Sequence, residues 1–102
     1  MQPQELVQRL KAGQAPVVMD VRTGMEFRKG HIPGALHVPT WKILLFMAPL
    51  PPDKRSELVV LCELGPRAMI AKVLLSLLGY RNITLLEGHM AGWRRSALPQ
   101  QK

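Results

Sequence analysis

Residues 58–67 read Leu58-Val59-Val60-Leu61-Cys62-Glu63-Leu64-Gly65-Pro66-Arg67. The first four residues are all apolar, which is typical of a strand buried on both faces of a parallel sheet. The segment 66–78 has helical spacing, with Pro66 near its first turn and Gly79 just after its end, as is usual for a helix. A strand, a short loop and a helix are therefore expected in this order, with Cys62 at the end of the strand.

The rest of the chain repeats this alternation of short apolar runs and helical segments. Further strands are predicted at 17–21, 35–38 and 83–86, and further helices at 4–11, 25–27, 41–48 and 88–95. Thr23 and Thr40 are expected to cap the helices that follow them. The alternation predicts an α/β fold, with a central, mainly parallel sheet covered by helices on both faces. Ligands of such folds bind beyond the carboxyl ends of the strands, where Cys62 is placed.

The length of 102 residues suits one domain and is too short for two with useful cores. We expect a single domain over 1–102, ordered over about 3–98, with residues 99–102 as a C-terminal tail. The polar N-terminus does not resemble a signal peptide, and no apolar run approaches the ~20 residues of a membrane span. A cytoplasmic location without membrane association is therefore the default expectation. The single cysteine excludes an intramolecular disulfide and agrees with a reducing compartment.

The chain carries a formal net charge of +7. Its basic residues are dispersed, and none form a stripe interleaved with aromatic residues. A nucleic-acid-binding protein usually gathers its basic residues in such a stripe or patch, so no nucleic-acid partner is expected. A solvated basic surface that attracts small anions is the simpler interpretation.

The loop after Cys62 combines several features that suit an ionised sulfur. A loop that enters a helix presents backbone N–H groups and the positive end of the helix dipole, and both stabilise anions and thiolates. Gly65 permits the backbone conformation of a tight cradle, and Arg67 would add a positive charge. We therefore predict Cys62 as a nucleophile. The predicted anion-binding loop consists of Glu63, Leu64, Gly65, Pro66, Arg67 and Ala68. The alternative is an inert core cysteine, since free cysteines are often buried. The strand-end position, Gly65, Arg67 and the following helix together disfavour it.

Two residues of this loop depart from an ideal cradle. Pro66 has no N–H and removes one donor. Glu63 places an acid beside the nucleophile, and we expect it to face solvent, because a carboxylate turned inward would be uncompensated.

Several polar residues near strand ends have structural interpretations. Asp20 and Arg22 are predicted to brace the active-site loops by hydrogen bonds rather than to contact substrate. His31 is expected to donate to a carbonyl in a turn, and His37 to fit its strand without a further role. His89 and Trp93 follow the last strand, which places them at the mouth of the pocket, although a core position is the commoner outcome for Trp93.

Residues 41–47 are unusually apolar and read Trp41-Lys42-Ile43-Leu44-Leu45-Phe46-Met47. Only one face of this helix can pack on the sheet, so some of the apolar side chains should be exposed. An exposed patch would suit a partner protein, a hydrophobic substrate or a dimer, and an excess by chance is an equal alternative. A monomer or weak homodimer is expected.

Three motifs in order resemble the signatures of single-domain rhodanese-like sulfurtransferases. They are Asp20-Val21-Arg22 with Glu26-Phe27, Gly30-His31-Ile32-Pro33-Gly34-Ala35 and Val38-Pro39; then residues 62–67; then Leu86-Glu87-Gly88 with Gly92-Trp93. His89 stands where the family commonly has a second glycine. The resemblance covers nearly the whole chain. It implies a parallel sheet of about five strands and no metal or organic cofactor.

The resemblance also implies a reaction. A sulfane sulfur would pass from thiosulfate or a persulfide donor to a thiol or cyanide, through a persulfide on Cys62, with Arg67 assisting an anionic substrate. A sulfur-relay protein is a further partner of this kind of chemistry. Cysteine phosphatases of the same fold place their arginine six positions after the cysteine, whereas Arg67 follows Cys62 by five, which favours sulfur over phosphate. A non-catalytic binding or regulatory module and a thiol redox sensor are the alternatives.

Overall fold

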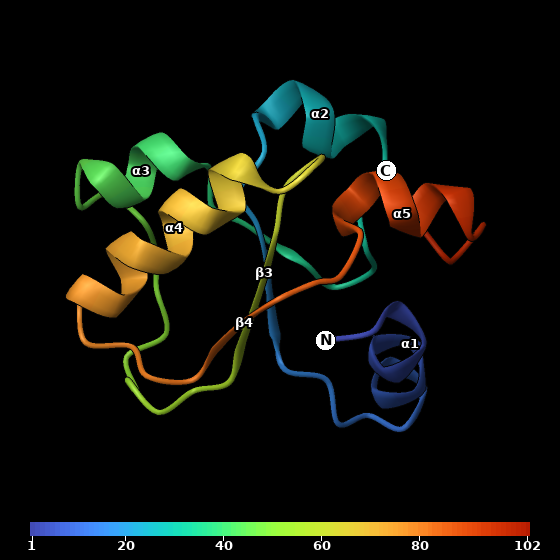
Figure 1. Cartoon of the computed structure of the whole chain (residues 1–102), viewed down its shortest axis with the longest axis horizontal. Coiled ribbons are helices and arrows are strands. Elements are labelled where there is room, and N and C mark those ends of the chain that lie inside the picture. The colour runs from blue at the N-terminus through green and yellow to red at the C-terminus, as the bar shows by residue number, and fades with distance from the viewer.

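The computed structural model describes residues 1–102, which form an α/β domain around a four-stranded parallel sheet. The strands are β1 (Val17–Asp20), β2 (Leu36–His37), β3 (Leu58–Leu61) and β4 (Ile83–Leu85), in the order β2-β1-β3-β4 (Figure 1). The predicted fold class is confirmed, with four strands where about five were expected. A further pairing, between His31 and Gln101, is only an isolated antiparallel bridge. Pro33 follows within two residues and cannot donate to a ladder, so this pairing does not extend into a strand.

Five helices surround the sheet. They are α1 (Pro3–Lys11), α2 (Gly24–Lys29), α3 (Thr40–Leu44), α4 (Pro66–Leu77) and α5 (His89–Arg95). Helices α3 and α4 lie side by side on one face, while α1 and α5 lie on the other (Figure 1). Helix α2 lies beyond the carboxyl ends of the strands, next to the start of α4. No helix is both long enough and apolar enough to cross a membrane.

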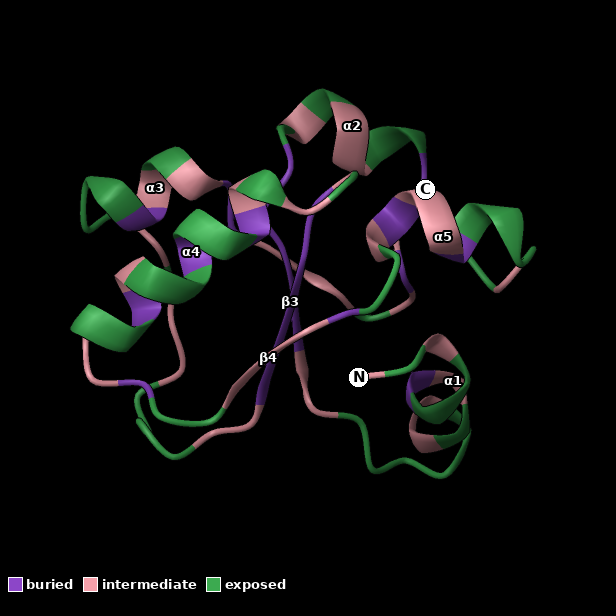
Figure 2. Cartoon of the chain, in the orientation of Figure 1, coloured by how far each residue is buried: buried purple, intermediate pink, exposed green.

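Alternate residues of β3 belong to two cores, one on each face of the sheet. Figure 2 shows that β3 is buried along its length. Leu58 and Val60 pack with α3 and α4, and Cys62 continues this face just after the strand. Val59 and Leu61 pack on the opposite side with α1 and α5. All of these residues are fully buried, as expected for a central parallel strand. Trp93 belongs to the second core, so it is a core anchor and not part of the pocket mouth.

The two predicted helix caps have different outcomes. Thr23 caps α2 and forms a full capping box with Glu26, which confirms that prediction. The Thr40 prediction is wrong, because Pro39 is the N-cap of α3 and the Thr40 hydroxyl instead donates to the Val21 carbonyl at 3.3 Å. Helix α3 also ends earlier than predicted. Phe46 adopts a left-handed conformation with φ +58° and lets the chain turn back on the helix.

The apolar face of α4 is turned differently from a simple amphipathic helix. The helical spacing of residues 66–78 puts Ile70, Val73, Leu74, Leu77 and Leu78 on one face and predicts that this stripe packs on the core. Only Leu74 and Leu78 of this stripe pack against the core, whereas Ile70, Val73 and Leu77 are exposed. The buried side chains are Ala68, Ala71 and Leu75. Small alanines let the helix lie close to the sheet, and the larger apolar side chains are left facing outward.

The C-terminal residues, predicted to be a tail, lie against the body of the domain. His31 and Gln101 exchange backbone hydrogen bonds of 2.8 and 2.7 Å, and the Trp93 Nε1–H donates to the Pro99 carbonyl at 2.8 Å. The His31 Nδ1 also lies 2.9 Å from the Phe27 carbonyl oxygen, which agrees with its predicted bond to a carbonyl in a turn.

Candidate active site

Cys62 lies at the topological switch point of the sheet, where successive strands are added on opposite sides of β1. From β1 the chain crosses to β2 on one side, and β3 and β4 extend the sheet on the other side. Asp20 and Leu61, the last residues of β1 and β3, are paired neighbours. The carboxyl ends of two adjacent strands therefore diverge here, which creates a crevice where ligands of open α/β sheets bind. Cys62 is the first residue beyond β3 and is fully buried at the base of this crevice.

The loop from Cys62 to Arg67 curls around the sulfur. The Gly65 N–H donates to Cys62 Sγ at 3.0 Å, and the Gly65 carbonyl accepts the Met69 N–H at 3.0 Å. Gly65 has φ +131° and ψ −38°, a conformation that side chains resist. Pro66 occupies the first turn of α4, where a missing N–H costs no helical hydrogen bond.

Several backbone donors of the loop have no acceptor within the chain. They are the N–H groups of Glu63, Leu64, Arg67 and Ala68. Together with the Gly65 N–H they surround the start of a twelve-residue helix, α4, whose dipole adds partial positive charge. Successive free N–H groups of this kind form an anion-binding nest. The predicted loop is therefore assembled at the sulfur, even though Pro66 supplies no donor.

The start of α5 is hydrogen-bonded to the first residues of the loop. The Met90 and Ala91 N–H groups donate to the Cys62 and Glu63 carbonyls at 2.9 and 3.1 Å, and the Cys62 N–H donates to His89 Nδ1 at 3.3 Å. Burial lowers the pKa of His89, which favours the neutral ring that can accept this bond. His89 thus lies under the loop and holds Cys62 in place, a role that its sequence position did not reveal.

Arg67 is held by a carboxylate from another helix. Its guanidinium donates to both oxygens of Glu26 on α2, at 2.6 and 3.0 Å. The hydrogen bonds from Arg67 lower the pKa of Glu26 to about 2, so the carboxylate is charged at neutral pH. The expectation that Arg67 brings a full positive charge to the site is therefore corrected, because Glu26 neutralises most of it. Sequence reasoning named Glu26 only as part of a family motif and gave it no role in the site.

Glu63 also has a different position from the one expected. Its carboxylate accepts from Arg94 on α5, at 3.2 Å from Nη1 and closer still from Nη2, and it lies 3.4 Å from Arg22 Nη1. The expected solvent-facing orientation is wrong for this reason. Two guanidinium groups compensate the acid, so it can turn toward the protein at little electrostatic cost. Arg94 was also missed, since it looked like an ordinary exposed basic residue at a helix end.

Asp20 and Arg22 form a buried ion pair that braces this end of the sheet. The Arg22 Nε and Nη2 donate to the Asp20 carboxylate at 2.8 to 3.1 Å, and Nη2 also donates to the Gly30 carbonyl at 2.8 Å. Arg22 therefore links β1, the end of α2 and, through Glu63, the active-site loop. His37 was expected to have no further role, but its Nε2 lies 2.8 Å from the Arg22 carbonyl oxygen and helps to hold this segment.

Two depressions open at this edge of the sheet. The smaller, of about 260 Å³, is lined by Cys62, Glu63, Leu64, Pro66 and Arg67. The larger, of about 340 Å³, is lined by Arg22, Glu26, Lys29, Gly30, Glu63, Arg94 and Gln100. Glu63 stands between them. The smaller depression gives the route to Cys62, and the size is suited to a small anion or the tip of a thiol.

The charges around the site are arranged in pairs. Asp20 with Arg22, Glu26 with Arg67 and Glu63 with Arg94 cancel one another over short distances. The positive potential that remains at Cys62 therefore comes largely from backbone N–H groups and the α4 dipole. No cluster of three or more His, Cys, Asp or Glu side chains is placed to hold a metal ion.

Comparison with known proteins points to one family. The rhodanese-like domain model matches residues 2–96. A sulfurtransferase of Allochromatium vinosum is 33% identical over 96 residues, which span 94% of this chain and 88% of that protein. Thiosulfate sulfurtransferase GlpE of Haemophilus influenzae is 29% identical over 97 residues, with 95% and 89% covered. The structure of the human single-domain sulfurtransferase TSTD1 superposes with a TM-score of 0.78 at 29% identity, covering 93% and 94% of the two chains.

Proposed function

Because this chain belongs to the rhodanese-like domain family and its relatives are sulfurtransferases, we propose that Cys62 carries the transferred sulfur as a persulfide. The donor is thiosulfate or a persulfide, and the acceptor is a thiol or cyanide. The observation that carries the proposal is the Gly65 N–H bond to Cys62 Sγ inside a nest of free backbone donors. This nest suits an anionic sulfur and offers little to a neutral ligand.

The first half of the reaction loads the enzyme. The Cys62 thiolate attacks the outer sulfur of thiosulfate, a new S–S bond forms, and the S–S bond of thiosulfate breaks. Sulfite leaves with that electron pair, and Cys62 is left with one additional sulfur. The free N–H groups of the loop stabilise the negative charge as it moves from the thiolate to the substrate and then to the terminal sulfur.

The second half returns the enzyme to its starting state. A thiolate or cyanide attacks the terminal sulfur of the persulfide, and the bond between the two sulfurs breaks. The electron pair returns to Cys62 Sγ, and the Gly65 N–H donates a hydrogen bond to the thiolate that forms. No external oxidant or reductant is needed, since one S–S bond is exchanged for a bond to the acceptor at each turnover.

Arg67 contributes to anion binding, but with most of its charge neutralised. Its bond to Glu26 fixes the guanidinium beside the loop and removes most of its net charge. We infer that Arg67 orients an anionic donor by direct hydrogen bonds more than by long-range attraction. Asp20 and Arg22 do not contact the substrate. They support the site by fixing the end of β1 and the position of Glu63.

Mass spectrometry tests the central claim. The purified protein is incubated with thiosulfate, and its intact mass is compared with that of Cys62→Ser treated in the same way. We expect the gain of one sulfur atom, removed by cyanide or a thiol and missing from the variant. If neither thiosulfate nor glutathione persulfide gives an adduct, the chain is a binding module or a redox sensor and the proposal is wrong.

A further inference from the structure

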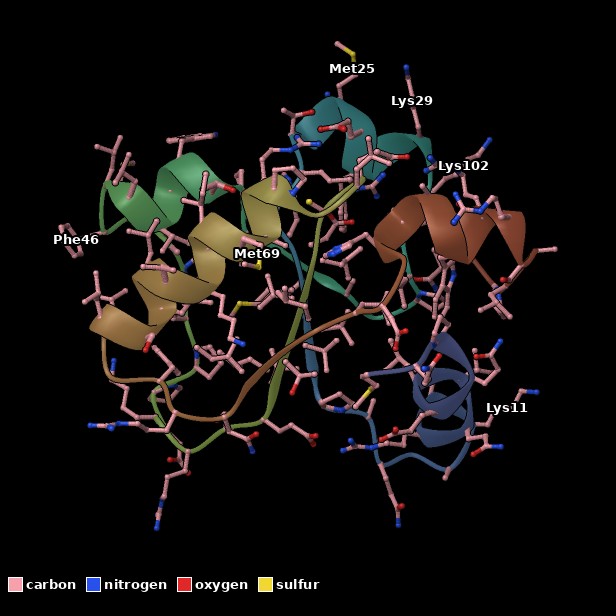
Figure 3. The ribbon with its side chains drawn as sticks, in the orientation of Figure 1. Lys11, Met25, Lys29, Phe46, Met69 and Lys102 are labelled. Atoms are coloured by element: carbon pink, nitrogen blue, oxygen red, sulfur yellow. The ribbon has the colours of Figure 1, made fainter.

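A broad apolar surface covers the outer sides of α3 and α4. We call it the α3–α4 face, and its side chains are between 52% and 80% exposed. It consists of Trp41, Leu44, Leu45, Phe46, Met47, Met69, Ile70, Val73 and Leu77. Figure 2 shows the exposed outer turns of both helices, and Figure 3 shows Phe46 pointing away from the body of the domain. The exposed area is on the order of 1,000 Å², as much as one partner contributes to a standard protein interface and more than a typical monomer exposes.

This face reaches the opening above Cys62. Leu64, which lines the depression over Cys62, is 75% exposed and lies two residues before α4 begins. Cys62 itself is fully buried, so an acceptor has to enter this depression, whose apolar lining is Leu64 and Pro66. A macromolecular acceptor that reached Cys62 would therefore be placed with its body against α4. The outer side of α4 offers it a groove of about 350 Å³ lined by Met69, Lys72, Val73, Ser76 and Leu77.

The charged residues of this face indicate whether its partner is acidic or basic. The segments 40–52 and 64–80 contain no Asp or Glu, and their only charged residues are Lys42, Arg67 and Lys72. Arg67 is neutralised by Glu26, whereas Lys42 and Lys72 form no ion pair. A second copy of this chain would bring the same lysines and a net charge of +7 to the contact, which disfavours a homodimer. An acidic partner would gain from both lysines and from the overall field.

We propose that the α3–α4 face docks an acidic protein that exchanges sulfur with Cys62, and this rests on the function proposed above. The partner has an apolar patch rimmed by carboxylates, and its reactive cysteine lies on a projecting loop or flexible tail that fits the depression. In the transfer, the thiolate of the partner attacks the terminal sulfur of the Cys62 persulfide. Its bond to Cys62 Sγ breaks, the electron pair returns to Cys62, and the partner leaves as a persulfide.

A protein explains the observations better than a lipid surface does. A membrane would cover Trp41 and Phe46 with equal ease, but it has no group that needs access to Cys62. Exposed apolar side chains occur both at the mouth of the Cys62 depression, where Leu64 lies, and in the groove of α4, which begins at Met69, and a protein thiol can use both. Lys72 also lies within the groove of α4, where it can pair with a single carboxylate of a partner.

The test uses a designed peptide thiol as the acceptor. The peptide is a helix of leucine and glutamate with a cysteine on a glycine linker, and a matched peptide has lysine in place of glutamate. The chain is first loaded with sulfur by thiosulfate, and loading is verified by intact mass. Single-turnover sulfur transfer is then followed to each peptide and to glutathione. We expect the acidic peptide to react about tenfold faster than the basic one at low salt, with the preference reduced at high salt.

Variants connect this preference to the surface. Leu77→Glu and Lys72→Glu should each reduce the ratio of acidic-peptide rate to glutathione rate about tenfold, because both act on the contact with the larger acceptor. Gln8→Glu adds the same single negative charge as Leu77→Glu, but on α1, on the other face of the sheet, and should leave that ratio unchanged. Trp41 reports binding directly, since the other tryptophan, Trp93, is buried. Its emission should shift to shorter wavelength with the acidic peptide only.

Three outcomes would overturn the proposal. Equal rates for the two peptides, with unchanged ratios in both variants, would remove the docking role while successful loading left the function of Cys62 intact. A concentration-dependent dimer in sedimentation that Leu77→Glu dissociates would assign the face to a second copy. Binding to phosphatidylglycerol vesicles that Phe46→Glu abolishes, without a preference between the peptides, would assign it to a lipid surface. Failure of the loading step itself would instead contradict the proposed function.

Discussion

Arg67 and Glu26 form a two-point ion pair across the mouth of the active site, with N–O distances of 2.6 and 3.0 Å. The pair joins the first turn of α4 to α2, and the two residues are 41 positions apart in sequence. It fixes the arginine that follows Cys62 by five residues and cancels most of its charge. We therefore propose that the loop binds anions mainly through its backbone, and that the arginine controls geometry and selectivity.

Replacing Glu26 should unmask the charge of Arg67. In Glu26→Gln, we expect Cys62 to react faster with the anion iodoacetate relative to neutral iodoacetamide, by about threefold at low salt. The pKa of Glu26 is lowered to about 2, so the pair stabilises the fold above pH 4.5 and this stabilisation is lost as the pH falls toward 2. Because both side chains are about one-third exposed, the loss should be only about 1 kcal/mol, measured by urea unfolding. An unchanged reagent ratio would contradict the neutralising role.

Replacing Arg67 by Ala should affect the two classes of sulfur donor unequally. Turnover with thiosulfate should fall by about tenfold or more, because the donor is a dianion that loses an oriented hydrogen-bond donor. Turnover with a neutral persulfide donor should fall less. Steady-state rates with the two donors measure this, and Arg95→Ala, at the far end of α5, is the matched control. Equal losses with both donors would show that Arg67 has no role toward the anion.

Gly65 should not tolerate a side chain. At φ +131°, a residue with a β-carbon would have a strained backbone, and the β-carbon would lie 3.2 Å from Nε2 of His89. The Nδ1 of the same ring accepts the hydrogen bond from the Cys62 N–H. We expect Gly65→Ala to lose most thiosulfate turnover and about 2 kcal/mol of stability. Gly34→Ala is the control, since Gly34 has φ +79° but nothing within 4 Å of the added carbon. It should lose comparable or less stability and keep its turnover. Similar loss of turnover in both variants would point to a general effect of strain.

The buried pair of Asp20 and Arg22 should dominate the polar stability of the domain. In Asp20→Asn, Arg22 loses its closest carboxylate at a site that is almost wholly buried and keeps only the longer contact with Glu63, at 3.4 Å. We expect a loss of about 3 kcal/mol, seen as a lower urea midpoint. Asp53→Asn removes an exposed partner of Arg55 at 3.6 Å and should cost under about 0.5 kcal/mol. Comparable midpoints for the two variants would refute the bracing role.

His89 should make stability sensitive to mild acid. Its folded-state pKa is lowered below 6.5 by burial, so the unfolded chain binds a proton first as the pH falls. Stability is therefore complete above 6.5 and declines below it, down to the folded pKa. Protonation also removes the Nδ1 acceptor of the Cys62 N–H. Urea midpoints at about pH 7.5 and pH 5.5 should differ less in His89→Asn, whose amide oxygen accepts without titrating. An equal drop in both proteins would exclude His89 as the cause.

The order of strands and helices, the parallel sheet and the position of Cys62 could all be predicted from local patterns. Apolar runs such as Leu58–Leu61, and the Pro66 and Gly79 boundaries of α4, are set by backbone sterics and burial within a few residues. These effects operate wherever the segment occurs. The loop around Cys62 follows from the same local rules, because a strand that leads directly into a helix must place its last residue at the helix N-terminus.

The tertiary structure alone decided which charges meet and which apolar faces remain open. Glu26 and Arg94 reach Arg67 and Glu63 only because α2 and α5 fold over the same edge of the sheet, and no local rule pairs residues so distant in sequence. The exposed stripe on α4 likewise depends on the angle at which Ala68 and Ala71 approach the sheet. At Cys62, local sequence therefore determined the sulfur and its backbone cradle. Long-range packing determined that this cradle, more than the arginine beside it, provides the charge that an anion meets.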